Sequence, residues 1–255
     1  MNTPLTSDYL AKYVPSLYAE SAYPGASSRY NFMSTASVMH GLSYAGILPY
    51  SAKQSRTRIE GKAGYVKHTV RFRSPNAPLI VGDTVPEIVL TNSHDRASSF
   101  SLELGLFRLV CSNGLVTSSA SFQSYKIRHI FSTADDVIGA VHAIIEQFPK
   151  LETTVNAWAG IILSSDQQLA FAEQASLIRW NNGKAPFDYS RLLSTRRQDD
   201  WAPTLWNTYN KVQENLTQGQ ASSSAYSNRA SRAVTGLDAG LDINRQLWAL
   251  AETFA

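Results

Sequence analysis

The chain has 255 residues, of which 44% are hydrophobic, enough to bury a substantial core without disulfides or structural metals. Its single cysteine, Cys111, excludes an intramolecular disulfide and a metal site built from several cysteines, and it favours a reducing compartment. The formal net charge is only +3, no apolar run is long enough to cross a membrane, and the first residues do not resemble a signal peptide. We therefore expect a cytoplasmic protein without a membrane partner.

Positive charge is concentrated in one segment. Residues 51–75 carry seven Lys and Arg against one acid, Glu60, which gives a local charge of +6. Such a patch attracts phosphate groups. The alternative is a solvated strand surface whose charges protect a sheet edge from pairing with another chain.

The first 50 residues predict helices. Residues 6–20 have helical character, and Pro15 forces a break or a second start. A second helix is expected from a Ser34 cap to Gly46, because serine caps helix N-termini and glycine ends helices.

Residues 54–131 predict an antiparallel sheet rich in hairpins, because apolar and polar residues alternate with a period of two. Asn113-Gly114 is a strong hairpin signal, since both residues tolerate positive φ, and residues 61–64 form a plausible turn. The expected strands are 54–60, 65–73, 87–90, 100–106 and 122–131.

Two of these strands have one apolar and one cationic face. If they join one sheet in matching orientation, they form a basic and partly aromatic surface suited to the phosphates and bases of a single strand. The residues predicted to bind nucleic acid are Tyr65, Lys67, Arg71, Arg73, Lys126 and Arg128.

The second half of the sequence predicts helices. An apolar stripe at helical spacing begins near Val137, and Pro149 interrupts it. Further helices are expected at 151–163, from 165 to before 182, after Pro203, and at 242–254, with a low-complexity loop at 217–228. Strands followed by helices predict an α+β fold, with segments 1–50, 51–131 and 132–255 forming one compact domain.

A second cluster of polar residues is Asn92, His94, Asp95, Asn113 and His129. A histidine beside an aspartate can act as a base with its orienting carboxylate, or both can bind a metal. The competing interpretation is that Asn92 and Asp95 cap turns. His68 and His129 lie on apolar strand faces, where a histidine is usually a hydrogen-bonded core residue. The spacing of the histidines matches no compact metal motif, so we predict no cofactor.

Two further features favour structural roles. Cys111 follows an apolar strand, where free cysteines are commonly buried and inert. A helix carries an unusual number of polar residues for its length, and these predict a buried hydrogen-bond network rather than a ligand site. They are Asn207, Asn210, Gln213, Glu214 and Asn215.

Several long motifs resemble one protein family. They are NSHDRASSF from residue 92, LFRLVCSNGL from residue 106, IRH from residue 127, LWNTYNKVQENLTQG from residue 205 and NRQLW from residue 244. The chain resembles the phage/plasmid-like proteins of domain-of-unknown-function family 932 over roughly residues 35–250. It departs from the family pattern at Arg96 and Gln220, where the family favours glycine. The resemblance implies carriage on a phage, prophage or plasmid and implies no established reaction.

Taken together, these features favour a nucleic-acid-binding protein of a mobile element, without a cofactor, acting as a single-stranded DNA binding or annealing factor in recombination. A sheet followed by a long helix is analogous to the unit found in phage single-strand annealing proteins, at the level of fold. A homo-oligomer fits this function. The alternatives are a metal-dependent enzyme using the histidine and aspartate cluster, and a protein-binding counter-defence factor.

Overall fold

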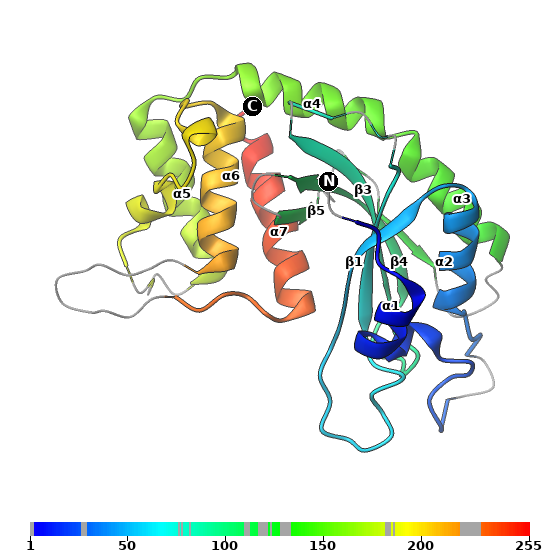
Figure 1. Cartoon of the computed structure of the whole chain (residues 1–255). Coiled ribbons are helices and arrows are strands. Elements are labelled where there is room, and N and C mark those ends of the chain that lie inside the picture. Colours follow the sequence, from blue (N-terminus) through cyan, green and yellow to red (C-terminus); the bar gives the residue numbers. More distant parts are fainter. Residues whose placement is uncertain are drawn as a thin grey trace. The chain divides into compact units, whose positions relative to one another are not determined.

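A computed structural model describes residues 3–26, 30–75, 77, 79–81, 83–109, 113–116, 122, 124–127, 134–181, 185, 187–219 and 231–255. The chain forms two compact units, Met1–Phe148 and Pro149–Ala255 (Figure 1). The first holds the sheet and the second is helical, as predicted for an α+β protein. The boundary between the two units falls inside the predicted segment 132–255. That the three predicted segments form one compact domain stays a prediction.

The first unit is built on an antiparallel sheet of six strands. The strands follow the order β1-β2-β3-β4-β5, and β6 also pairs with β4. Its elements are α1 (Ser7–Tyr13), the 3-10 helix η1 (Pro15–Tyr18), α2 (Thr35–Tyr44), β1 (Leu48–Gln54), β2 (His68–Arg73), β3 (Thr84–Asn92), β4 (Phe100–Arg108), β5 (Asn113–Val116), β6 (Tyr125–Ile127) and α3 (Ala134–Ile145).

One face of this sheet forms the core of the first unit. Helix α2 contacts β1, and α3 contacts β4 and β6. The strand residues on this face are buried, with exposures of 1% or less: Val70, Phe72, Ile88, Leu90, Phe100, Leu102 and Leu104. Burial of seven large apolar side chains at about 1.5–3 kcal/mol each stabilises the sheet against unfolding.

The predicted N-terminal helices are confirmed. Thr6 caps α1 by accepting a hydrogen bond from the Tyr9 amide, and Pro15 starts η1 instead of continuing α1. Ser34 caps α2, and Gly46 follows that helix with a φ of 78°.

Two details of the predicted sheet are wrong. The first strand is Leu48–Gln54, not residues 54–60, and Pro49 is accommodated because β1 is an edge strand. Residues 55–67 form a long connection that is closed by a hydrogen bond from the Ser55 amide to the Lys67 carbonyl (2.7 Å). Asn113 and Gly114 do not form the turn, because they lie within β5, opposite Arg108 and Phe107.

The second unit is a group of helices around an aromatic core. Rings of Trp158, Tyr209 and Trp248 pack with centroids 4.4–5.8 Å apart, and Trp206 stacks on Tyr209. The elements are α4 (Phe148–Gly160), α5 (Ser165–Arg179), η2 (Tyr189–Leu193), η3 (Gln198–Asp200), α6 (Leu205–Gln218) and α7 (Leu237–Glu252). Across the described ranges, no helix combines the length and the apolar character needed to span a bilayer.

Candidate functional site

A row of polar residues crosses the sheet on the face opposite the apolar core. Residues directly opposite each other on paired strands point to the same side of a sheet. The register joins Lys53 to Thr69, Thr69 to Thr91, Thr91 to Ser101, and Ser101 to Lys126. The Thr69 and Thr91 hydroxyl oxygens are 3.2 Å apart, which confirms their common orientation.

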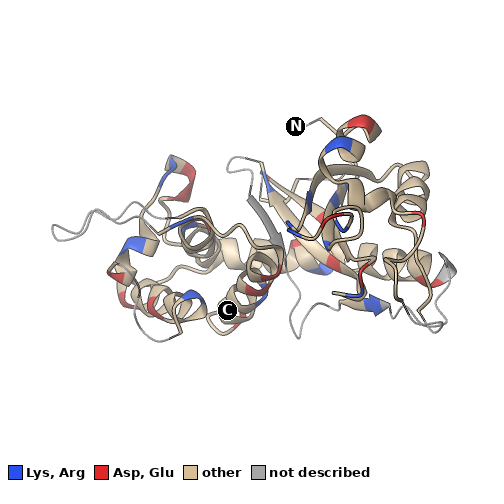
Figure 2. Ribbon diagram, turned by 90° about the horizontal axis from the view of Figure 1, so that it is seen from below, with Lys and Arg blue, Asp and Glu red and all other residues tan. Residues whose placement is uncertain are grey.

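We call this side of the sheet the polar face; its ionisable members are Lys53, Arg71, Arg73, Glu87, Glu103 and Lys126. Figure 2 shows Lys and Arg in blue on the strands of this sheet. The cations of β2 and Lys126 of β6 therefore share a face, as the alternation predicted. Arg128 lies outside the described residues.

Arg71 and Arg73 differ from the prediction in one important respect: their charges are paired inside the protein. Arg71 Nη1 lies 2.6 Å from Glu87 Oε2, and Arg73 Nε lies 2.6 Å from Glu87 Oε1. Glu87 is fully buried, and the two arginine side chains are only 14% and 4% exposed. These arginines therefore hold β2 to β3 and do not present bare cations to a phosphate.

Aromatic rings enclose the Arg73 guanidinium. Its Cζ lies 4.7 Å from the centroid of Tyr50 and 3.5 Å from that of Phe107. The hollow beside it, lined partly by Pro75 and Val85, has a volume of about 20 Å³. That is room for about one water molecule, so it is too small for a larger ligand.

Within the basic segment 51–75, three exposed cations lie at the end of β1 and in the connection that follows it. Lys53, Arg56 and Arg58 are exposed and make no ion pair with any other described residue. Lys126 is exposed at the other side of the sheet, roughly 19 Å from Lys53 over four strand spacings. Lys67 is half-buried and has an interaction partner.

Tyr65 lies in the β1–β2 connection and not in a strand, which differs from the prediction. It is half-buried, and its ring packs edge-on against Tyr23 at a centroid distance of 5.3 Å. Its carbonyl accepts a hydrogen bond from the His94 amide (2.9 Å). These contacts fix the connection against β3 and occupy one face of the ring that was predicted to stack on bases.

The structure brings His68 and His94 together beneath the first turn of α2. Both are fully buried, and their ring centroids are 5.2 Å apart. Thr35 Oγ1 lies 2.9 Å from His68 Nε2 and 3.4 Å from His94 Nε2. It also accepts a hydrogen bond from the side-chain amide of Asn92 (2.9 Å). His68 Nδ1 lies 3.1 Å from the Val66 carbonyl, so Nδ1 carries the proton and Nε2 accepts from Thr35.

This cluster keeps His68 neutral. Burial, together with a smaller effect of the neighbouring His94, lowers the pKa of His68 to about 3. The prediction of a hydrogen-bonded core histidine is therefore confirmed for His68. His129 lies outside the described residues, as does Cys111, and the side chain of Asn113 is likewise not described.

The His68 environment predicts loss of stability in acid. The unfolded chain binds a proton near pH 6.5 and the folded chain only near pH 3, so stability falls as the pH drops between these values. At pH 5 the loss from this residue is about 2 kcal/mol. Urea unfolding followed by circular dichroism at several pH values measures it.

The control for this pH dependence is the exposed His40. His40→Asn should keep the acid-induced loss of stability, whereas His68→Asn should flatten it. Equal pH dependence in the wild type and in His68→Asn would show that His68 does not carry the effect.

Asp95 is held by partners in the β1–β2 connection and in its own turn. It forms an ion pair with Lys62 (3.0 Å), and its Oδ1 accepts a hydrogen bond from the Ala97 amide (3.0 Å). Burial raises the pKa of Asp95, but the hydrogen bonds from Lys62 and Ala97 outweigh this effect and hold it below its usual value. The turn-capping interpretation is confirmed for Asp95 and also for Asn92, whose side-chain oxygen accepts from the Ser93 amide.

Arg96, in the same turn, has a φ of 68°, a conformation that favours glycine. Its guanidinium donates a hydrogen bond to the Gly25 carbonyl (2.8 Å), which ties the turn to the N-terminal segment. In the described part of the chain, no group of three or more His, Cys, Asp or Glu is arranged to hold a metal ion.

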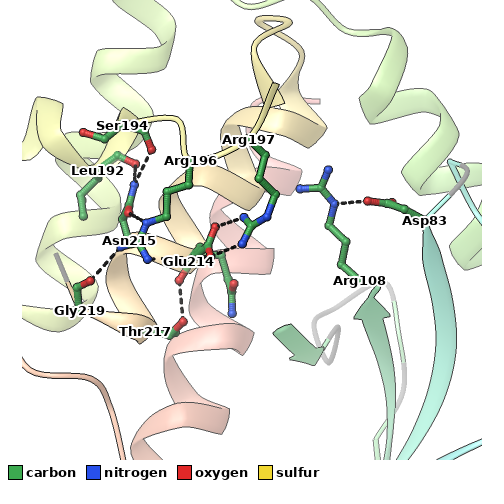
Figure 3. Close-up of polar contacts among 11 residues, drawn as sticks. Asp83, Arg108, Leu192, Ser194, Arg196, Arg197, Glu214, Asn215, Thr217 and Gly219 are labelled. Carbon is green, nitrogen blue, oxygen red and sulfur yellow. Dashed lines mark hydrogen bonds and ion pairs between the residues drawn. The ribbon is translucent and has the colours of Figure 1, made fainter. Parts of the chain in front are cut away.

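Four of the five polar residues of α6, Asn210, Gln213, Glu214 and Asn215, are buried and hydrogen-bonded as predicted, whereas Asn207 is half-buried and donates to the carbonyls of Asp199 and Ala202 (Figure 3). Both carboxylate oxygens of Glu214 accept from the Arg197 guanidinium. The Asn215 amide donates to the carbonyls of Leu192 and Ser194, at 2.9 Å in each case. Gln213 donates to the Asn244 side chain (3.0 Å) in α7. This network joins α6 to the segment 188–200 and to α7, and it is structural.

Sequence reasoning missed Glu87 and the Asp83–Arg108 ion pair (2.6 Å). Glu87 is the one acid inside an apolar strand segment, and this was the signal available in the sequence. Burying a carboxylate without a partner costs too much free energy, so such an acid needs a cation beside it. That signal predicts a cationic partner on a neighbouring strand but does not identify it.

Comparison with known proteins identifies a family, and the similar proteins include two from one organism. A family model described as "Domain of unknown function (DUF932)" matches residues 25–248. The UPF0380 protein YafZ of Escherichia coli (strain K12) is 37% identical over 251 residues, covering 98% of this chain and 91% of YafZ. The UPF0380 protein YfjQ of the same strain is 36% identical over 252 residues, with the same two shares. No solved structure matches.

Proposed function

We propose that this chain, which belongs to the DUF932 family, binds single-stranded nucleic acid through the basic edge of its sheet. The basic edge consists of Lys53, Arg56 and Arg58, at the end of β1 and in the connection that follows it. We further propose that this binding serves the handling of mobile-element DNA, with strand annealing in recombination as the specific role, and the phage or plasmid carriage that the family resemblance implies supports this proposal.

The observation that carries the proposal is that the three cations of the basic edge are exposed and make no ion pair with other described residues. The acid nearest to them in sequence is Glu60, so the segment keeps a positive charge. Nucleic-acid affinity comes largely from such cations, because each phosphate contact releases a condensed counterion. Lys126 is also exposed on the polar face, but it is a separate cation, because Thr69, Thr91 and Ser101, which lie between it and Lys53, are buried.

Arg71 and Arg73 have a different role in this proposal. Their pairing with Glu87 fixes the strand that lies beside β1, and this positions Lys53 opposite Thr69. The cations that contact phosphate are then those of the basic edge and Lys126, not the arginines of β2.

The test is binding of a fluorescently labelled oligothymidylate, followed by fluorescence anisotropy over a range of salt concentrations. We expect the triple variant Lys53→Ala/Arg56→Ala/Arg58→Ala to bind about 10-fold more weakly or worse. The slope of log K against log salt should fall by about 2, because three phosphate contacts on a single strand are lost.

The matched control removes two exposed cations of the second unit, in the variant Lys150→Ala/Arg232→Ala. It should retain the affinity and the salt slope of the wild type. A triple variant that binds with unchanged affinity and slope while remaining folded by circular dichroism would remove the basic edge from the proposal.

A further inference from the structure

An exposed pair of aromatic rings lies beside the basic edge. Tyr9 and Tyr13 are four residues apart in α1, and their ring centroids are 4.6 Å apart. They are 45% and 56% exposed, so both rings are accessible to a ligand. Lys12 places its ammonium group 5.2 Å from the centre of the Tyr13 ring, which adds positive charge to the pair.

Both ends of this helical segment are tied to β1. The Leu5 amide donates to the Pro49 carbonyl (2.7 Å) at the start of the strand. The Ser16 amide and hydroxyl both donate to the Gln54 side chain, at 3.1 and 2.9 Å, at the end of the strand. Helix α1 therefore lies alongside β1, next to the beginning of the β1–β2 connection (Figure 1).

These attachments bring the aromatic pair close to the basic edge. Tyr13 is three residues from Ser16, and Gln54 is one residue from Lys53 and two from Arg56. An extended chain spans at most about 3.6 Å per residue, so Tyr13 and Arg56 are separated by less than about 30 Å between their Cα atoms. A single-stranded site of about 4–16 nucleotides covers such a distance.

We infer that Tyr9 and Tyr13 form a base-stacking site that accepts the unpaired bases of a strand whose phosphates contact Lys53, Arg56 and Arg58. This inference rests on the proposed function, and it explains why the protein would prefer single strands to a duplex. In a duplex the bases are already stacked on each other, so exposed rings favour single strands. Cations alone bind both forms, because phosphates are common to both.

The experiment compares oligothymidylate with an abasic oligonucleotide of the same length, which has the same phosphates and no bases. We expect the wild type to bind oligothymidylate more tightly. The variant Tyr9→Leu/Tyr13→Leu keeps apolar volume and removes the rings, and it should lose about 10- to 100-fold in affinity for oligothymidylate. Its affinity for the abasic strand and its salt slope should be unchanged.

The conservative variant Tyr9→Phe/Tyr13→Phe keeps both rings and should bind like the wild type. A leucine variant with wild-type affinity for oligothymidylate would overturn the stacking site while leaving the basic edge intact. Equal affinity of the wild type for oligothymidylate and for the abasic oligonucleotide would overturn the stacking site as well. If the wild type binds neither strand, the proposed function itself fails, and the stacking site fails with it.

Discussion

Replacing Glu87 with alanine is expected to lower the free energy of unfolding by about 3–5 kcal/mol, because removing one partner of a buried ion pair leaves uncompensated charge. Glu87 is fully buried and accepts from both Arg71 and Arg73. The Arg73 side chain, only 4% exposed, cannot turn to solvent without leaving its aromatic contacts. Its guanidinium would stay desolvated and lack its carboxylate.

The measurement must report the stability of the first unit, Met1–Phe148, which contains Glu87. All five tryptophans lie in Pro149–Ala255, so tryptophan fluorescence reports the second unit. Amide hydrogen exchange of the strands follows the sheet instead. We expect protection of β2 and β3 to fall most, because the ion pairs join these two strands.

A matched variant separates charge from packing. Replacing the whole group, in Arg71→Met/Arg73→Met/Glu87→Leu, should be closer to neutral than Glu87→Ala, because no unpaired charge is left behind. A loss below about 1 kcal/mol for Glu87→Ala would show that the pairs do not stabilise the sheet.

The alternation of residues predicted the faces of the sheet but not the pairing across it. A period of two places Arg71 and Arg73 on one side of β2 whatever its neighbours are. Which residue lies beside them depends on the register with β3, and a shift by one residue changes every neighbour. Glu87 and the arginines are at least 14 positions apart in sequence, so local patterns could not connect them.

Two local sequence signals predicted the wrong secondary structure, at residues 54–60 and at Asn113-Gly114. Residues 54–60 were assigned to a strand because they precede the plausible turn at 61–64, but Ile59 is their one apolar residue and it is 57% exposed. Asn113-Gly114 suits a turn by its backbone preferences, yet tertiary pairing places it in β5. By contrast, the capping signal at Ser34 was reliable, because the side chain and the amide that donates to it are only three residues apart.

The polar network of α6 was predictable in kind and not in detail. Its excess of Asn, Gln and Glu indicated buried hydrogen bonding, because asparagine is a poor helix former. Its partners could not be predicted, since the Leu192 carbonyl lies in the short 3-10 helix η2 and Arg197 directly precedes η3, where local patterns do not fix the path of the chain. For the candidate site, composition identified the basic segment, and the structure then distinguished Lys53, Arg56 and Arg58, which are exposed and make no ion pair with other described residues, from the rest.

Replacing Gly219 with alanine is expected to lower the free energy of unfolding of the second unit by about 2–5 kcal/mol, through backbone strain and a steric clash. Gly219 follows α6 with φ 86° and ψ 140°, a conformation that side chains disfavour. An added Cβ would lie 2.4 Å from the Ser231 carbonyl oxygen and 3.1 Å from the Ala233 amide nitrogen. Both are backbone atoms, so relief of the clash requires the chain itself to shift.

Neighbouring hydrogen bonds oppose that shift. The Val234 amide donates to the Thr217 carbonyl (2.8 Å), and Arg179 donates to the carbonyls of Leu216 and Arg232. Tryptophan fluorescence during urea unfolding measures the loss, since the tryptophans report this unit. The control is Gly240→Ala in α7, where nothing lies within 4 Å of the added Cβ. That change should stabilise the helix by about 0.5–1 kcal/mol, because alanine is the better helix former. Equal stability of the two variants would mean that the end of α6 can move to accept a side chain, and that the segment 231–236 is not held against it.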